Sequence, residues 1–125
     1  MATKVLLDTN ILIAAFRRNE KAVEFLGNKS YIFFISDITI MEIFAGCHTV
    51  RKRKEFEQIM KFYGRAPLTS TSADKALSLI KRYSVQRFSL QIPDILIAAT
   101  AIHYNLPLKS LNIKDFDFIR ELELI

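Results

Sequence analysis

Short apolar runs alternate with longer segments of helical periodicity, and this alternation limits the possible folds more than any other feature of the chain. Residues 5–7 and 31–35 are uninterrupted apolar runs, which are typical of strands buried on both faces of a parallel sheet. Further strands are expected at 65–68, at 106–111 and, as a final edge strand, at 121–125. The pattern predicts an α/β fold in which right-handed helical crossovers join a parallel sheet of roughly five strands.

Capping residues and apolar spacing predict the helices between these strands. In order, helices are expected from about Asn10, within 19–28, from Ser36 and Asp37 to Gly46, over 50–63, after the Ser and Thr cluster at 69–72, and after Pro93. Residues 94–105 are apolar nearly all round, so we expect the last helix to lie at the centre of the fold. A loop is expected at 87–94, and a loop or short helical turn at 112–119.

The composition is that of one globular domain spanning residues 1–125. Half of the residues are hydrophobic and 25% are charged, a balance unlike that of disordered chains. The apolar runs are shorter than the roughly 20 residues of a membrane-spanning helix, and the N-terminus lacks the pattern of a secretory signal. Cys47 is the single cysteine, which fits a reducing compartment. We therefore expect a cytoplasmic protein that is not associated with a membrane.

Acidic side chains stand at positions where a charge is unfavourable. Asp8 ends the first apolar run, Glu42 lies within a largely apolar helix, and Asp94 opens the central helix. Asp8 is expected at the edge of the sheet where the strands end and where ligands of such folds bind. Ionised carboxylates in apolar surroundings are costly unless they are paired or bind a metal. Singly, Asp8 fits a turn and Asp94 fits a helix cap, but together the acids favour a cation site.

Further oxygen ligands follow the strand expected at 106–111. They are supplied by Asn112, Asp115 and Asp117. Carboxylate and amide oxygens suit Mg²⁺ or Mn²⁺. Neither histidine shares the helix face of its neighbouring acidic residue, so the spacing argues against a zinc site. We expect both histidines and Cys47 to be structural.

Four stretches carry these features in a characteristic order: LLDTNILIA with Asp8, ISDITIMEIFAG with Glu42, PDILIAATAIHYNLPL with Asp94, and KSLNIKDFDFI near the C-terminus. Together they resemble the PIN-domain ribonucleases, and within that family the VapC-type toxins of toxin–antitoxin pairs. The resemblance covers the whole chain. It implies a three-layer α/β/α domain and an endoribonuclease that hydrolyses RNA phosphodiester bonds with water activated by Mg²⁺ or Mn²⁺.

The resemblance also implies roles for individual residues. The catalytic residues would be Asp8, Glu42, Asp94 and Asp115, of which the first three would bind the metal. Supporting roles would fall to Thr9, Asn10, Thr39, Ser110 and Asn112, with Asn10 orienting the first carboxylate. Asn112 stands where the family often has an aspartate, so we expect Asp115 to compensate and a single ion to be firmly bound. A second ion would arrive with the RNA.

A net charge of +5 favours a polyanionic partner such as nucleic acid or an anionic membrane face. The densest basic run is Arg51, Lys52, Arg53 and Lys54. Each of these side chains alone is typical of a solvated helix, but as a set beside an acidic site they are expected to give RNA affinity of low sequence specificity. The family resemblance further implies a homodimer and a groove that receives a segment of a cognate antitoxin protein.

Two other functions fit part of the pattern. A phosphoacceptor receiver domain has a similar length and sheet, but it needs an acidic pair after its first strand and an aspartate after its third, where this chain has PLTSTS. A PIN-like fold kept only as an RNA-binding module would have a metal site weakened at Asn112. The carboxylates of Asp8, Glu42 and Asp94 favour the enzyme.

Overall fold

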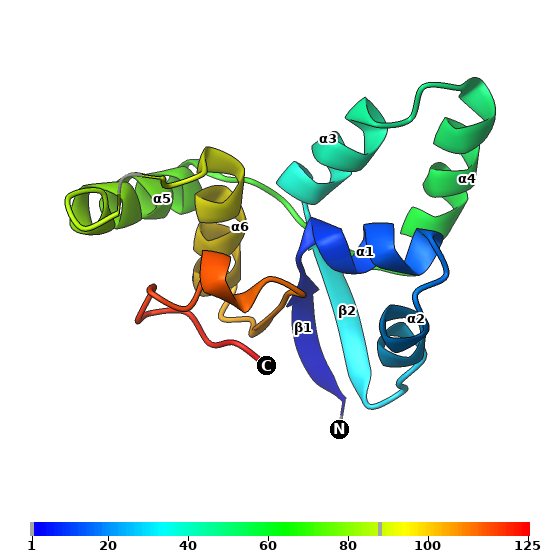
Figure 1. Ribbon diagram of the computed structural model, residues 1–125, viewed down its shortest axis with the longest axis horizontal. Coiled ribbons are helices and arrows are strands. Elements are labelled where there is room, and N and C mark those ends of the chain that lie inside the picture. Colours follow the sequence, from blue (N-terminus) through cyan, green and yellow to red (C-terminus); the bar gives the residue numbers. More distant parts are fainter. Residues whose placement is uncertain (1, 88) are drawn as a thin grey trace.

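A parallel sheet of four strands forms the middle of the computed structural model, which describes residues 2–87 and 89–125 (Figure 1). The strands are β1 (Thr3–Leu7), β2 (Tyr31–Ser36), β3 (Gly64–Ala66) and β4 (Leu108–Lys109). Their order across the sheet is β3-β2-β1-β4, and each neighbouring pair is parallel. The predicted parallel α/β architecture is therefore confirmed.

The sheet is smaller than the roughly five strands predicted. Within the described part of the chain, the expected edge strand at 121–125 contributes a single bridge, in which Leu124 pairs with Leu108. The strand expected at 106–111 is reduced to Leu108–Lys109. With so short a β4 as its neighbour, the C-terminal segment has little backbone with which to form a ladder.

Six helices and one short 3₁₀ turn complete the described residues. They are α1 (Thr9–Phe16), α2 (Glu20–Leu26), α3 (Asp37–Ala45), α4 (Val50–Met60), α5 (Ser70–Tyr83), α6 (Ile92–His103) and the turn η1 (Ile113–Asp115). The first five begin after polar side chains that accept a backbone N–H, namely Asp8, Asn19, Ser36, Thr49 and Thr69. In this part of the chain, none is long and apolar enough to cross a membrane.

Helix α6 begins inside the loop that was predicted at 87–94. Its first residue is Ile92, and Pro93 lies in the first turn, where a missing N–H removes no helical hydrogen bond. Phe88, which belongs to the same predicted loop, lies outside the described residues. The helix is buried along most of its length, so the expectation of a central last helix is confirmed.

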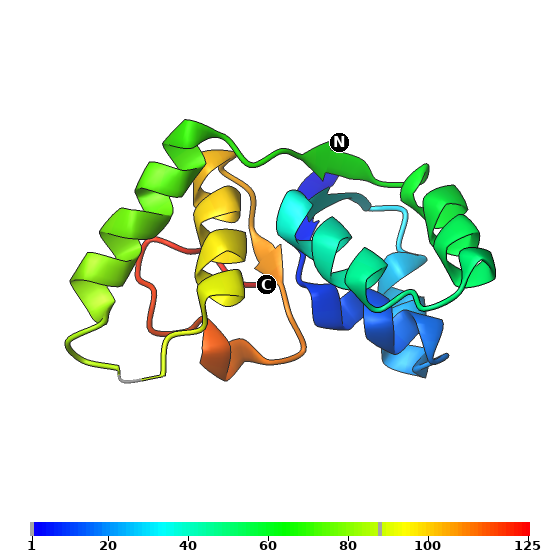
Figure 2. The ribbon, with the colours of Figure 1, turned by 90° about the horizontal axis from the view of Figure 1, so that it is seen from above.

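Helices cover both faces of the sheet and produce the predicted α/β/α layers. Side chains alternate along β1, so Val5 and Leu7 pack with residues of α1, α3 and α4, whereas Leu6 packs with residues of α5 and α6. Figure 2 shows α5, α6 and the C-terminal segment on one side of the strands and α1 to α4 on the other. The sheet thus separates two apolar clusters.

The strand register gathers several strand ends at one edge. Leu7, the last residue of β1, pairs with Ile35 in β2 and with Lys109 in β4. The residues that come next to these paired positions in the chain are Asp8, Ser36 and Ser110. Because the strands are parallel, these polar side chains lie at the same carboxyl edge of the sheet.

Asp37, the first residue of α3, fixes that helix to the neighbouring strand. Its carboxylate accepts hydrogen bonds from Nε of Arg65 in β3 (2.5 Å) and from the backbone N–H of Leu68 (2.9 Å). The bond from Arg65 holds the pKa of Asp37 below its usual value. At Gly64, the residue before Arg65, a Cβ atom would overlap the ring of Phe34, so glycine at this position leaves room for that ring.

Candidate active site

Asp8 is a buried carboxylate at the junction of β1 and α1. Its side chain is 6% exposed, Oδ1 accepts the backbone N–H of Thr9 (2.8 Å), and Oδ2 accepts the hydroxyl of Ser110 (2.8 Å). Burial raises the pKa of Asp8, the two hydrogen bonds oppose this effect, and the nearby charges of Glu42 and Asp115 raise the pKa further. The carboxylate is therefore both firmly oriented and electrostatically strained.

Ser110 connects Asp8 to the amide side chain of Asn10 and to the backbone of Asn112. Its hydroxyl oxygen accepts hydrogen bonds from Nδ2 of Asn10 (3.2 Å) and from the backbone N–H of Asn112 (2.9 Å) while its proton goes to Asp8. Oδ1 of Asn10 also accepts the backbone N–H of Leu111 (3.2 Å). Asn10 thus reaches the carboxylate of Asp8 through Ser110.

Glu42 extends from the solvent side of α3. Its sequence neighbours suggested apolar surroundings, yet Glu42 is exposed and the adjacent Met41 is 62% exposed. The Glu42 carboxylate is held instead by one hydrogen bond, from the hydroxyl of Thr9 to Oε1 (2.8 Å). Thr9 in turn lies 2.9 Å from the hydroxyl of Thr39, so the supporting residues named from the sequence do meet here.

Asp94 is the third residue of α6 and faces the same region. Burial and the charges of Asp115, Asp8 and Glu42 together raise the pKa of Asp94 to about 6. Asp115 lies on η1, and its Oδ2 accepts a hydrogen bond from Nδ2 of Asn112 (2.7 Å). The carboxylates predicted to act together, which come from four separate segments, are therefore electrostatically coupled, with Asn112 orienting the last of them. Asp117 is exposed and takes no part in these contacts.

The donor chemistry of this region fits a hard divalent cation. Its side chains present carboxylate, hydroxyl and amide oxygens, which are ligands that Mg²⁺ and Mn²⁺ prefer. Among the described residues, no three acidic, histidine or cysteine side chains converge tightly enough to hold a metal ion as they stand. The region therefore has suitable ligand atoms and an excess of negative charge. Its acidic side chains lie farther apart than they would around a bound ion.

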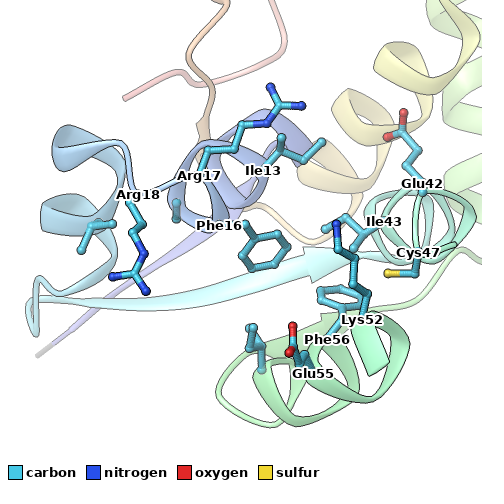
Figure 3. A pocket seen from close by; sticks show the side chains of 14 residues that line it. Ile13, Phe16, Arg17, Arg18, Glu42, Ile43, Cys47, Lys52, Glu55 and Phe56 are labelled. Atoms are coloured by element: carbon cyan, nitrogen blue, oxygen red, sulfur yellow. The ribbon is translucent and has the colours of Figure 1, made fainter. Parts of the chain in front are cut away.

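An apolar groove of about 730 Å³ includes Glu42 in its lining (Figure 3). Glu42 lies at one end of it, and helices α1 to α4 provide its walls. The apolar lining includes Ile13, Phe16, Val23, Ile43, Phe56 and Ile59, and the charged lining includes Arg17, Arg18, Lys52 and Glu55. Phe16 is 42% exposed and packs edge-on against Phe56. Cys47 also lines this groove.

The basic run on α4 is less uniform than its sequence suggests. Arg51 pairs with Glu55 (3.2 Å) and Arg53 pairs with Glu57 (3.5 Å), each one helical turn along α4. Lys52 lines the groove, whereas Lys54 lies with Arg51 on a separate shallow surface of the helix. The four predicted RNA-binding side chains therefore do not form one continuous basic surface.

Comparison with known proteins identifies the class of protein that this fold and site define. The sequence pattern of the PIN domain matches residues 5–120, so the chain belongs to the PIN domain family. Ribonuclease VapC of Rickettsia bellii is 30% identical, with 97% of this chain and 94% of that protein covered. Ribonuclease VapC10 of Mycobacterium tuberculosis is 29% identical over 95% of this chain and 90% of that protein. The resemblance to the VapC group is thereby confirmed.

Solved structures agree with this assignment. A toxin–antitoxin complex from Klebsiella pneumoniae contains a chain that is 29% identical and superposes with a TM-score of 0.80, with 94% of each chain covered. VapBC2 from Rickettsia felis, bound to a promoter DNA fragment, superposes with a TM-score of 0.87 at 22% identity over 98% of each chain. The receiver-domain alternative is therefore wrong.

Some residues of the site were not identified from the sequence. Ser36 was expected only as a helix cap, and the groove residues Arg17 and Arg18 were not singled out. The spacing Ser36-x-x-Thr39-x-x-Glu42 places the hydroxyls one turn apart on the same helical stretch as the acid, and it was a usable signal. The groove depends on how four helices pack against one another, and this packing cannot be predicted from a local sequence pattern.

The raised pKa of Asp94 predicts that this carboxylate destabilises the metal-free protein. A folded-state pKa near 6 means that ionised Asp94 disfavours folding above pH 6, and that protonation relieves this as the pH falls toward the unfolded value of 3.8. Asp94→Asn should raise the melting temperature in EDTA at pH 8 by about 4 °C, or about 1 kcal/mol after discounting for the half-exposed side chain.

The gain should disappear near pH 4, where Asp94 itself is protonated. Thermal unfolding in EDTA across this pH range measures it, with the same substitution at the exposed Asp74 of α5 as the control. An equal gain at both pH values, or an equal gain for Asp74→Asn, would contradict the coupling of the carboxylates.

Proposed function

We propose that this chain is a metal-dependent endoribonuclease and the toxin of a toxin–antitoxin pair. The observation that carries the proposal is the electrostatic coupling of Asp8, Glu42, Asp94 and Asp115 at the carboxyl edge of the sheet. Coupling of this kind raises the energy of the free site and favours a divalent cation that neutralises it. The names of the relatives, Ribonuclease VapC, and the toxin–antitoxin complexes among the structural neighbours support the same function.

Asp8, Glu42 and Asp94 would hold Mg²⁺ or Mn²⁺, with Asp115 as the fourth acid of the site. When bound, the ion would supply Lewis acidity toward water and toward the scissile phosphate. The protein itself would contribute orientation. Ser110 and Thr9 fix one oxygen each of Asp8 and Glu42, and Asn112 fixes one oxygen of Asp115. Pre-oriented ligands bind an ion with less loss of side-chain entropy.

The RNA backbone would contact lysines rather than the whole basic run of α4. Glu55 and Glu57 partly neutralise Arg51 and Arg53, whereas Lys52 projects into the groove that ends at Glu42. A lysine in the same groove as Glu42 is suited to bind the phosphate of an RNA that enters the site, and this contact should weaken as salt rises. A role for Lys54 would be limited to RNA that also covers the outer face of α4.

Cleavage of total cellular RNA tests the enzyme directly. The antitoxin-free protein should produce fragments with Mg²⁺ or Mn²⁺ and none in EDTA, and Asp94→Asn should lower the rate at least about 100-fold because a metal ligand is lost. Asp74→Asn, the same change on an exposed face of α5, should cleave like the unchanged protein. Cleavage that persists in EDTA or in Asp94→Asn would reject the proposed site.

A folded protein that binds Mn²⁺ and RNA but leaves RNA intact would favour the RNA-binding module instead. Asn112 is the residue on which that alternative depends. Its amide hydrogen-bonds to Asp115, which keeps a carboxylate in this part of the site. The contact supports the enzyme over the module.

The antitoxin would occupy the groove between α1 and α4. The apolar lining suits the apolar face of a peptide helix, and the rim residues Arg17, Arg18 and Lys52 suit acidic side chains beside that face. Because Glu42 lines both the groove and the acidic site, a segment bound there would lie next to the carboxylates. A homodimer and a cytoplasmic location stay predictions.

A charge placed in the groove should weaken antitoxin binding. Phe16→Glu puts a carboxylate on the apolar lining, so the affinity for the cognate antitoxin should fall at least about 10-fold by calorimetry. Leu77→Glu is the matched control, because Leu77 is a similarly exposed apolar residue on α5, away from the groove. Equal affinities for the two variants would place the antitoxin elsewhere.

A further inference from the structure

Ser36, Thr39 and Thr9 form a continuous buried line of hydroxyl groups that ends at Glu42. The hydroxyl oxygens of Ser36 and Thr39 are 3.3 Å apart, those of Thr39 and Thr9 are 2.9 Å apart, and Thr9 lies 2.8 Å from Oε1 of Glu42. Ser36 and Thr39 are completely buried, and Thr9 is 7% exposed. The line therefore runs from the end of β2, through α3 and α1, to the carboxylate.

The number of protons fixes the direction of these hydrogen bonds. A hydroxyl has one proton, and a carboxylate can only accept. The proton of Thr9 goes to Glu42, so Thr9 must accept from Thr39. The proton of Thr39 is thereby used, and Ser36 must donate to Thr39, while the Ser36 oxygen accepts the backbone N–H of Thr39 (3.1 Å). The hydroxyl protons of Ser36, Thr39 and Thr9 therefore all point along this hydroxyl chain toward Glu42.

Glu42 depends on this hydroxyl chain of Ser36, Thr39 and Thr9 for its orientation. It is an exposed side chain with several rotatable bonds, and within residues 2–87 and 89–125 it has no ion pair and no other side-chain hydrogen bond. An unrestrained glutamate loses rotamer entropy when it binds an ion. The bond from Thr9 removes part of that loss in advance, and Thr39 keeps the Thr9 proton directed at Oε1.

We propose that Thr39 is a positioning residue, at the centre of a one-way hydroxyl chain from Ser36 that preorganises Glu42 for a divalent cation. This inference rests on the proposed function, because it takes the cation to bind at Glu42. Thr39 would act on the cation site only through Thr9, whose hydroxyl lies between Thr39 and Glu42. Loss of an outer partner of a metal ligand typically weakens metal affinity about 10- to 100-fold.

The test compares Mn²⁺ dissociation constants of metal-free proteins, measured by electron paramagnetic resonance without RNA. Thr39→Val keeps the side-chain shape but removes the hydroxyl, and should weaken Mn²⁺ binding about 10-fold. Thr39→Ser restores the hydroxyl and should stay within about 2-fold of the unchanged protein. Thr100→Val is the control: Thr100 is equally buried, but its hydroxyl donates to the Leu96 carbonyl within α6 (2.8 Å). It should bind Mn²⁺ normally.

A double-mutant cycle separates positioning from packing. Thr9→Val removes the last link and should weaken Mn²⁺ binding at least as much as Thr39→Val. Once Thr9→Val is present, adding Thr39→Val should have little further effect, because the chain acts through Thr9. Thermal unfolding in EDTA shows which variants are folded, and Thr9→Val alone carries the test if Thr39→Val does not fold.

Three results would overturn the inference. Normal Mn²⁺ affinity in Thr39→Val, or in Thr9→Val if that variant carries the test, would leave the hydroxyl chain with a packing role only. Equal losses in Thr39→Ser and Thr39→Val would point to the methyl group. If the unchanged protein binds no Mn²⁺, the proposed metal site fails as well. If the unchanged protein binds Mn²⁺ and cleaves RNA, and the Mn²⁺ affinity of Thr39→Val is normal, only the proposed role of the hydroxyl chain is rejected.

Discussion

Mutual repulsion among carboxylates at one edge of a parallel sheet is the interaction on which the rest of this structure depends. Asp8 and Asp94 both have raised pKa values, and in both cases neighbouring acids contribute after burial. Like charges brought together at a partly dry surface destabilise the fold unless donors or a cation compensate them. The hydroxyl of Ser110, the backbone N–H of Thr9 and the N-terminus of α6 are the compensations that the chain itself supplies.

The sheet topology explains why these groups meet although they are far apart in sequence. Helical crossovers make all the strands parallel, so the chain returns to the same edge after each strand. The pairing of Leu7 with Ile35 and with Lys109 sets the level of that edge. Two hydrogen-bond networks, centred on Ser110 and Thr39, then orient carboxylates from different segments of the chain. We propose that the groove beside Glu42 receives the antitoxin.

The sequence predicted the parts of the fold that local physical chemistry determines. The runs at 5–7 and 31–35 are apolar throughout, and both form strands, although only 5–7 is fully buried and Ile32 of β2 is exposed. The prediction of an edge strand at 121–125 was wrong, because the alternating pattern of this segment does not show which contacts fix it to the rest of the fold. The Tyr83 hydroxyl donates to Glu121 and accepts the Arg120 backbone N–H. This side chain therefore makes hydrogen bonds to the segment that a neighbouring strand was expected to make.

The candidate site shows the same division. Asp8 and Asp94 were identified by their positions at element boundaries, which sequence records directly. Glu42 was chosen because its neighbours are apolar, but Met41 faces solvent and the hydrogen bond from Thr9 is what ties Glu42 to the site. The pairing of Arg51 with Glu55 could have been read from their spacing of one turn. The groove and the direction of the hydroxyl chain could not be predicted from the sequence, because both depend on how several helices and strands pack together.

The central claim is that these coupled carboxylates form one cation site. A crystal of the protein grown with Mn²⁺ and measured at the manganese absorption edge would test it most directly. We predict an anomalous peak within coordination distance of Asp8 and of at least one of Glu42 and Asp94. Manganese bound only at other places, or an edge of the sheet that stays free of it at saturating Mn²⁺, would contradict the claim.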